Sequence, residues 1–146
     1  MAQKENNIIP MIFDEAFYRK MATQKWRQQD YKKAAEYYEK VLELSPKDFD
    51  IQQHYAQCLV KLNIGKKAER LFYENIVKDF HVAESFYELS QLNIELNEPN
   101  KAFLFGINYV ILSEDKDFRE MLEKTFAVAY TNEQKIELEA QLFSTQ

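Results

Sequence analysis

The chain has 146 residues, of which 46% are hydrophobic and 29% are charged, so it is long enough to bury a core and too apolar to be disordered. Its net charge of −5 argues against nucleic acid as the main partner, because phosphate binding draws on a positive surface. With only two glycines and three prolines, the chain has little material for hairpins or phosphate-binding loops, and helix is favoured throughout.

The first residues, MAQKENN, lack a basic start followed by an apolar run, so we expect no secretory signal. No stretch approaches the length of a membrane span, and the acidic balance disfavours an anionic membrane surface. A single cysteine, Cys58, excludes an internal disulfide and fits a reducing compartment. We therefore expect a cytoplasmic protein with no membrane and no nucleic-acid partner.

An N-terminal extension is expected over residues 1–13. It contains the apolar run Ile8–Phe13, which Pro10 interrupts and which is too short to form a helix of its own. The run is either a lid over the exposed end of the first helices or a strap that occupies a groove of this chain or of a neighbour.

Paired helices are predicted from Asp14 onwards. Asp14 and Asp48 are expected N-caps, because their carboxylates can accept hydrogen bonds from the free amides of a first turn. Ser45-Pro46 ends the second helix, since the residue before proline disfavours the helical region, and Pro99 is suited to a first turn. The predicted helices are about 14–28, 31–44, 49–62, 65–79, 83–96 and 99–113.

Two further helices are predicted towards the end of the chain. The sequence FREMLEKTFAVAY, residues 118–130, predicts a seventh helix. Thr131 and Gln134 form a capping box for an eighth helix over Asn132–Phe143, because the hydroxyl and the amide side chain can satisfy each other's backbone donors.

The eighth helix is predicted to be apolar on two sides. Ile136, Ala140 and Phe143 share one face, while Leu138 and Leu142 lie almost opposite. A terminal helix should be polar on its outer side, so this one is expected to need a neighbour: a following repeat, a second copy of the chain, or a partner. A homo-oligomer formed through this helix is one of these expectations.

The helices repeat at a fixed distance. Ala34, Ala68 and Ala102 are 34 residues apart, and four residues on they are followed by Tyr38, Phe72 and Gly106. The preceding helices align under the same shift: Met21, Tyr55 and Leu89; Ala22, Ala56 and Ser90; Trp26, Val60 and Ile94. Such a period is typical of a helix-turn-helix solenoid, in which a small residue lets the two helices of a pair approach closely.

This pattern resembles the tetratricopeptide repeat (TPR) family. Tyr18 and Phe86 supply the early aromatic of the family pattern, and Pro46 supplies its closing proline, whereas Gln52 and Gly106 depart from it. The resemblance implies an all-α, right-handed superhelical solenoid of antiparallel helix pairs. We expect three TPR-like repeats at about 15–48, 49–82 and 83–116, with a degenerate fourth pair at 117–146, together forming a domain over 14–146.

The sequence offers few residues that could act in catalysis or bind a metal. His54 and Cys58 lie four residues apart on one helix, which is the spacing of a metal-binding pair, but no second pair completes a site. We therefore expect no metal, no cofactor and no enzymatic activity. Three lysines at the repeat period, Lys33, Lys67 and Lys101, indicate either a solvated ridge or a track for acidic segments of a partner.

The resemblance implies a non-enzymatic protein-interaction module whose concave groove receives a partner peptide or helix. The first helices of the repeats line that groove in similar proteins. Carried across by pattern, the groove residues are Arg19, Thr23, Trp26, Arg27, Gln53, His54, Gln57, Lys61, Tyr87, Glu88, Gln91 and Glu95. This wall runs from basic and aromatic to acidic.

Other members of the family bind different ligands or have structural roles. Co-chaperone members grip a terminal carboxylate with cationic side chains, but two of the corresponding places hold Glu84 and Glu88, which would repel that ligand. This specialisation is therefore not expected. A structural or assembly segment of a longer solenoid and a TPR-type chaperone for secreted proteins remain as alternatives.

Overall fold

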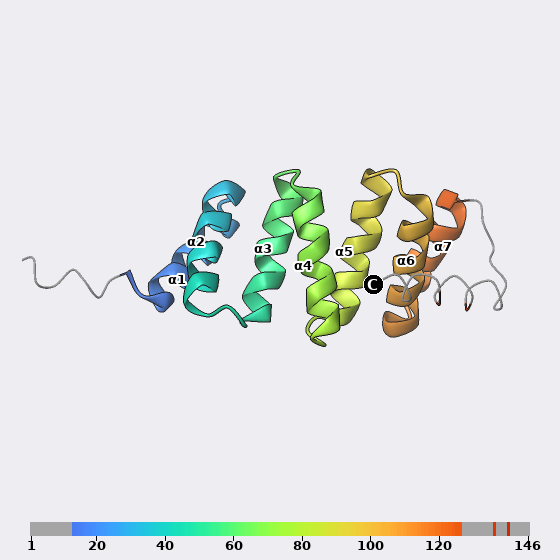
Figure 1. Cartoon of the computed structure of the whole chain (residues 1–146). Coiled ribbons are helices and arrows are strands. Elements are labelled where there is room, and N and C mark those ends of the chain that lie inside the picture. Colours follow the sequence, from blue (N-terminus) through green and yellow to red (C-terminus); the bar gives the residue numbers. More distant parts are fainter. Residues whose placement is uncertain (1–12, 127–135, 137–139, 141–146) are drawn as a thin grey trace, which may run out of the picture. The chain divides into compact units, whose positions relative to one another are not determined.

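The computed structural model describes residues 13–126 together with residues 136 and 140, and the described part contains α-helices and no strands (Figure 1). The elements in chain order are α1 Glu15–Arg27, α2 Tyr31–Leu44, α3 Phe49–Lys61, α4 Gly65–Val77, α5 Val82–Glu95, α6 Pro99–Ser113 and α7 Lys116–Phe126. The predicted all-α fold of helix pairs is confirmed. None of these helices has the length and apolar character needed to cross a membrane.

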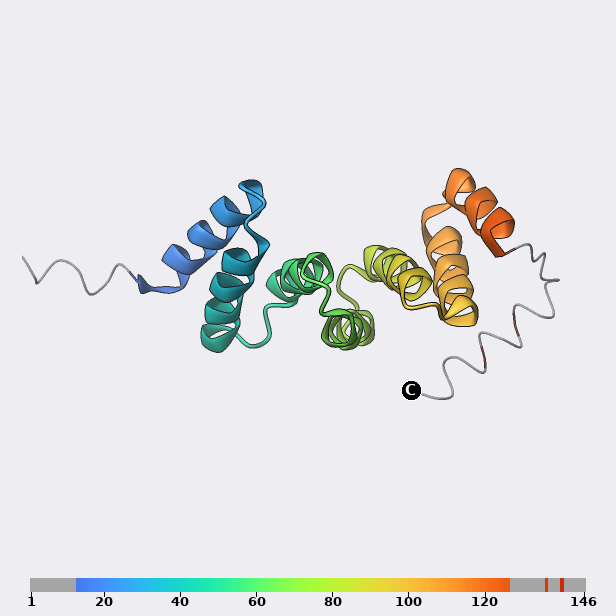
Figure 2. The same ribbon diagram turned by 90° about the horizontal axis from the view of Figure 1, so that it is seen from above.

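The chain divides into two compact units, and the boundary falls inside α4. The N-terminal unit ends at Leu71 and the C-terminal unit begins at Phe72. In the N-terminal unit α1 packs on α2 and α2 on α3; in the C-terminal unit α5 packs on α6 and α6 on α7. Figure 2 shows α1 beside α2 and α5 beside α6 as helical hairpins.

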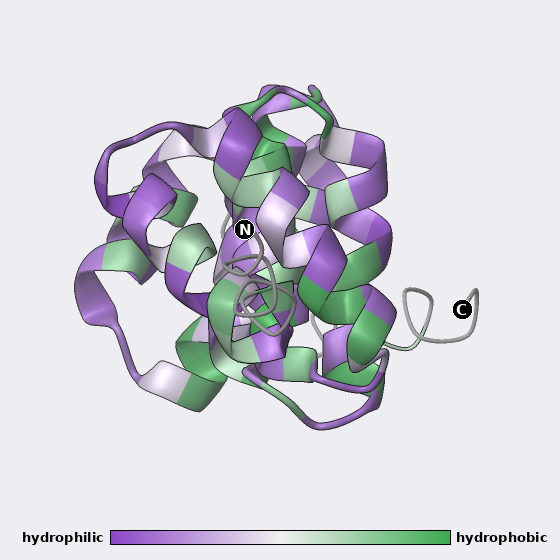
Figure 3. Cartoon of the chain, turned by 90° about the vertical axis from the view of Figure 1, so that its left-hand side faces the viewer, coloured by the Kyte–Doolittle hydropathy of each residue, from purple (hydrophilic) through white to green (hydrophobic). Residues whose placement is uncertain are grey.

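Buried alanines mark the close helix contacts that the period predicts. Ala34, Ala68 and Ala102 are all fully buried, and so are Ala22 and Ala56 in the first helices of their pairs. Apolar and polar residues alternate along the helices, which appears in Figure 3 as alternating green and purple on the ribbon. The buried apolar residues supply the core of each unit.

Aspartates cap the first three helices. The carboxylate of Asp14 accepts a hydrogen bond from the backbone N–H of Phe17 at 2.9 Å, and that of Asp48 accepts one from Ile51 at 3.1 Å. Asp30 caps α2 in the same way. Both caps predicted from the sequence are therefore confirmed.

A left-handed turn residue recurs at the repeat period. Gln29, Asn63 and Asn97 have φ angles of 61°, 62° and 59°, and each follows the first helix of a pair. The residue after each turn donates its backbone N–H back to a carbonyl five residues earlier, from Asp30 to Lys25, from Ile64 to Leu59 and from Glu98 to Asn93. These bonds satisfy carbonyls that the helix end would leave free.

The C-terminal unit has a core cluster formed by α6 and α7. It comprises Phe103, Ile107, Phe118 and Leu122, with Tyr87, Tyr109, Val110 and Met121 packed against it. A Cβ atom on Gly106 would lie only 2.4 Å from Leu122 Cδ1. Gly106 therefore stands where the other repeats have an aromatic residue because α7 packs directly on its backbone.

Some predicted features lie outside the described residues. These are residues 1–12 of the N-terminal extension, residues 127–130 of the seventh helix, the capping box of Thr131 and Gln134, and Leu138, Leu142 and Phe143. Two other residues of the predicted eighth helix, Ile136 and Ala140, are helical and exposed. Within the described part, α7 begins at Lys116, two residues before the predicted start.

Candidate interaction surface

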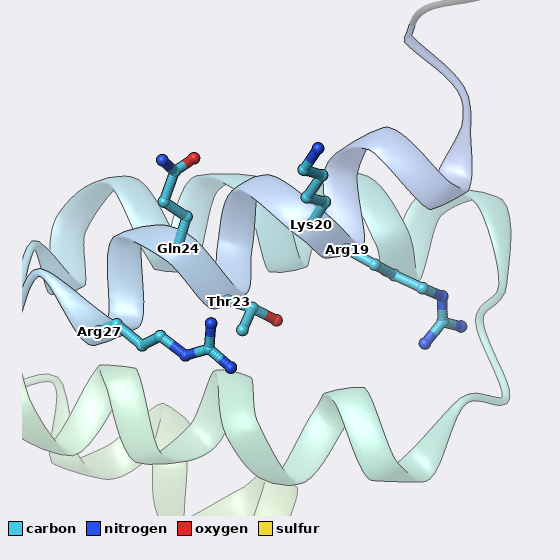
Figure 4. Close-up of a pocket in the computed structure, with 5 residues that line it drawn as sticks. All are labelled: Arg19, Lys20, Thr23, Gln24 and Arg27. Atoms are coloured by element: carbon cyan, nitrogen blue, oxygen red, sulfur yellow. The ribbon is translucent and has the colours of Figure 1, made fainter.

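One face of α1 forms a hollow of about 480 Å³ (Figure 4). Its lining residues are Arg19, Lys20, Thr23, Gln24 and Arg27. Arg19, Thr23 and Arg27 are predicted groove residues, spaced by four, so they follow one another along a single side of the helix. The sequence reasoning missed Lys20 and Gln24, although their own spacing of four places them on the adjoining row.

Arg19 is engaged by two carboxylates of its own unit. Its Nε donates to Glu15 Oε2 at 2.8 Å, and its Nη2 donates to Asp48. Glu15 also accepts a hydrogen bond from the Ser45 hydroxyl. This network ties α1 to the segment that leads into α3, so Arg19 serves to hold the fold together as well as to line the hollow.

The network shifts the ionisation of all three charged groups. The hydrogen bonds from Ser45 and then Arg19 lower the pKa of Glu15. Partial burial opposes ionisation of Asp48, but hydrogen bonds from Arg19 and from the Ile51 backbone outweigh it and lower the pKa of that carboxyl. The hydrogen bond to Asp48 raises the pKa of Arg19. Each group is therefore held in its charged form.

Lys20 and Arg27 differ from Arg19 because neither has a charged or hydrogen-bonded partner among the described residues. Both side chains are exposed, and so are Thr23 and Gln24 between them. In Figure 4, Thr23 and Arg27 extend from one side of α1 and Lys20 and Gln24 from another. The hollow therefore presents two cations and two hydrogen-bonding groups that can bind a ligand.

Trp26 lies at the end of α1 and is half-buried. Its ring meets Tyr31 edge to face, with the centroids 5.1 Å apart, and Lys61 Nζ lies 5.9 Å from the centroid of Tyr31. The cluster joins α1, α2 and α3, and it leaves part of the indole accessible. Trp26 therefore combines a packing role with partial exposure, and Arg27 follows it in the chain.

The predicted groove residues of α3 do not all reach a surface. His54 is exposed and contacts Tyr38 edge to face at 5.9 Å, and Gln57 is half-buried. Gln53 departs from the prediction, because its side chain is only 2% exposed. One helical step rotates a side chain by about 100°, which is enough to separate a surface position from an interior one.

The predicted groove residues of α5 belong to the C-terminal unit. Tyr87 packs against Tyr109 and Phe118, with both pairs of ring centroids 5.2 Å apart, and its hydroxyl accepts a hydrogen bond from Gln91 at 3.4 Å. Glu88 is half-buried and Glu95 is exposed. Tyr87 thus packs against the core cluster, which includes Phe118 of α7. Because α7 lies outside the three aligned repeats, the repeat pattern does not predict this contact.

The lysines at the repeat period have different surroundings. Lys67 lies with its Nζ 5.3 Å from the centroid of the Tyr55 ring and 4.0 Å from Glu39, whose carboxylate also accepts a hydrogen bond from the Tyr55 hydroxyl at 2.5 Å. Lys33 is exposed. The charge of Lys67 is therefore partly used within the N-terminal unit.

The described residues contain no group of three or more His, Cys, Asp or Glu side chains that could hold a metal ion. Cys58, which the sequence paired with His54, is buried, and burial raises the pKa of its thiol to about 12. Its environment is that of a packed, protonated thiol rather than of a nucleophile or metal ligand.

The paired helices, the buried alanines at a 34-residue period and the recurring left-handed turns define a helical-repeat protein. Residues 25–72 match the family model for the tetratricopeptide repeat, which supports the predicted resemblance to this family over that segment. Proteins of this family and fold are typically non-catalytic scaffolds that bind protein partners.

A solved structure shares the fold. The crystal structure of MamA protein superposes with a TM-score of 0.68, at 19% sequence identity, over 85% of this chain and 68% of the MamA chain. No curated protein sequence matches the chain significantly.

Proposed function

We propose that this chain is a non-catalytic interaction module that binds a peptide or helix of a partner protein through the first helices of its repeats. The hollow on α1 carries the proposal, because four of its five lining side chains, those of Lys20, Thr23, Gln24 and Arg27, are exposed polar groups that the fold itself does not require. A reducing, cytoplasmic compartment, where Cys58 stays a free thiol, is part of the proposal.

Trp26 and Arg27 are the proposed anchors of the partner. Tryptophan and arginine side chains are enriched among residues that dominate binding energy, because they combine a large contact area with hydrogen-bonding groups. In this structure Trp26 packs against Tyr31 and is half-buried, and Arg27 follows it directly in the chain. A side chain that is already ordered loses less entropy on binding.

The test begins with affinity capture from native lysate, followed by mass spectrometry and by a direct titration with each purified partner. The only tryptophan is Trp26, so its fluorescence reports binding to the unaltered protein, and isothermal titration calorimetry measures the affinity of the variants, because Trp26→Ala lacks this reporter. Trp26→Ala and Arg27→Ala should each weaken the affinity by about tenfold, which is typical of an interface anchor. A matched control is Leu44→Ala, which removes an exposed apolar side chain from α2 of the same unit.

Circular dichroism must first show that every variant is folded. If a captured partner binds the folded Trp26→Ala and Arg27→Ala variants as tightly as the Leu44→Ala control, the first helix of the first repeat does not form the binding surface.

A further inference from the structure

The two units of the chain carry opposite net charges. The N-terminal unit has 13 Lys and Arg against 10 Asp and Glu, a net charge of +3, whereas the C-terminal unit has 6 against 14, a net charge of −8. Together they give the −5 of the whole chain. The acidic overall balance therefore hides a basic N-terminal unit.

The charge reverses at equivalent places of the repeats. Lys20 and Glu88 are two repeats apart, and so are Arg27 and Glu95; between them Thr23 corresponds to Gln91. The fold thus accepts either sign of charge at these places. Packing within the repeat does not require the two cations of α1.

Local helix electrostatics explains only one of these cations. Arg27 stands in the last turn of α1, where a positive charge is favoured by the partial negative charge of the helix end. Lys20 stands in the middle of the helix, where the partial charge of the helix end does not stabilise a positive side chain. Both are exposed and have no partner among the described residues, whereas Arg19 is already neutralised by Glu15 and Asp48.

The geometry of the hollow suits an extended anionic ligand. Lys20 and Arg27 are separated by seven residues, which is about 10 Å along a helix at 1.5 Å per residue, and they extend from two sides of α1, so the ligand would cross the helix obliquely (Figure 4). Thr23 and Gln24 lie between them and can donate and accept hydrogen bonds. Two carboxylates at that separation would each meet a cation, and the backbone between them would meet the polar pair.

We propose that this face of α1 binds an internal acidic segment of a partner protein, with carboxylates paired to Lys20 and Arg27. The inference rests on the proposed function and adds the chemistry of the partner. The ligand differs from a terminal carboxylate, because the site holds two separated cations rather than one convergent cluster. Exposed ion pairs are individually weak and are screened by salt, so binding should weaken as salt is raised.

The test uses a short fluorescent peptide in which glutamate alternates with serine, amidated so that it has no terminal carboxylate. Its binding is measured by fluorescence anisotropy at low salt, against the same peptide with glutamine in place of glutamate. Lys20→Glu with Arg27→Glu copies the residues of the third repeat into α1, so the variant should fold. Lys32→Glu with Lys66→Glu is the control, because it makes the same charge change at exposed places elsewhere in the N-terminal unit.

The proposal expects the glutamate peptide to bind the protein and the control alike, and to bind the Lys20 and Arg27 variant at least about tenfold more weakly. The glutamine peptide should not bind. The assignment would be overturned if both variants lost the same affinity for the glutamate peptide, or if the glutamate and glutamine peptides bound equally well. Stronger binding of an oligouridine RNA than of the glutamate peptide would also overturn it. Self-association of the protein alone, abolished by the Lys20 and Arg27 change, would assign the face to a second copy and also overturn it.

A random peptide display library separates this inference from the function on which it rests. Recovery of acid-rich peptides that depend on Lys20 and Arg27 supports both. If the recovered peptides lack acidic residues and depend on Trp26 and Arg27 but not on Lys20, the proposed function stands and the acidic ligand is wrong. If no peptide is recovered, both proposals fail.

Discussion

Replacing Gly106 with alanine tests how closely α7 packs on α6. The new Cβ would lie 2.4 Å from Leu122 Cδ1, 2.9 Å from Leu122 Cδ2 and 3.0 Å from Ser90 Oγ. Neither neighbour moves freely, because Leu122 is 1% exposed within the core cluster and the Ser90 hydroxyl donates to the Ala102 carbonyl at 2.7 Å. The added methyl group must therefore displace a buried side chain.

Two opposing effects set the magnitude. Alanine is better than glycine inside a helix by about 1 kcal/mol. Overpacking a closed core costs about 1–3 kcal/mol. Gly106→Ala should therefore lower the free energy of unfolding by up to about 2 kcal/mol. Removing the main obstacle with Leu122→Ala, which itself costs about 2–5 kcal/mol, should leave the helix preference opposed only by the contact with Ser90 Oγ at 3.0 Å. In that background Gly106→Ala should raise the stability by up to about 1 kcal/mol.

Urea denaturation of the four proteins of this cycle, followed by far-ultraviolet circular dichroism, measures both effects. The decisive result is a difference in sign, destabilising beside Leu122 and stabilising beside alanine. If Gly106→Ala has the same effect in both backgrounds, the contact between α6 and α7 does not explain the glycine.

Four further changes test other parts of the structure. Ala68→Arg should lower the free energy of unfolding by several kcal/mol, since Ala68 is 0% exposed and a buried charge adds to the overpacking; a thermal melt checks this. The pKa values of Glu15 and Asp48 are lowered in the folded state, so the folded protein binds fewer protons than the unfolded chain. The stabilisation of the folded protein by these two carboxylates is therefore complete above their ordinary pKa values of 4.5 and 3.8. That stabilisation should decrease as the pH falls through these values towards the folded-state pKa values. The urea concentration at the midpoint of unfolding should therefore fall with pH, and it should fall less in Asp48→Asn than in the unaltered protein. Gln29→Gly should stabilise the protein by up to about 1 kcal/mol in chemical denaturation, because Gln29 has a φ of 61° that glycine adopts without strain. Cys58 should react with a thiol reagent only as fast as the protein unfolds, since the thiol is buried and protonated at neutral pH; addition of urea should accelerate the reaction.

Local signals explain why the helices could be predicted closely. The aspartate caps Asp14 and Asp48 and the period of the buried alanines act within one turn or one repeat, so the sequence carries them directly. Gly106 could be recognised as a departure but not explained, because its partner Leu122 belongs to α7, outside the three aligned repeats. A close contact of this kind depends on the fold and not on the pattern.

The candidate surface was predicted only in part for a similar reason. Periodicity selects a face of α1, but it cannot tell that Asp48, 29 residues away, neutralises Arg19 and leaves Lys20 and Arg27 as the available cations. Tyr87 shows the same limit, because its aromatic neighbours come from α6 and α7. The predicted interface through Leu138 and Leu142 lies outside the described residues and stays a prediction.

The left-handed residues at Gln29, Asn63 and Asn97 make the repeats interchangeable at their joints. Each first helix leaves through the same backbone bend, closed by the same hydrogen bond from the following residue. A piece of chain cut just after one bend and just after the next therefore has the same local backbone conformation at both ends. Residues 30–63 form such a piece. A second copy inserted after Asn63 would begin after the same left-handed bend that precedes residue 30 and would end with that bend again. This backbone should therefore accommodate insertion or deletion of whole 34-residue repeats with less strain than any other change of length.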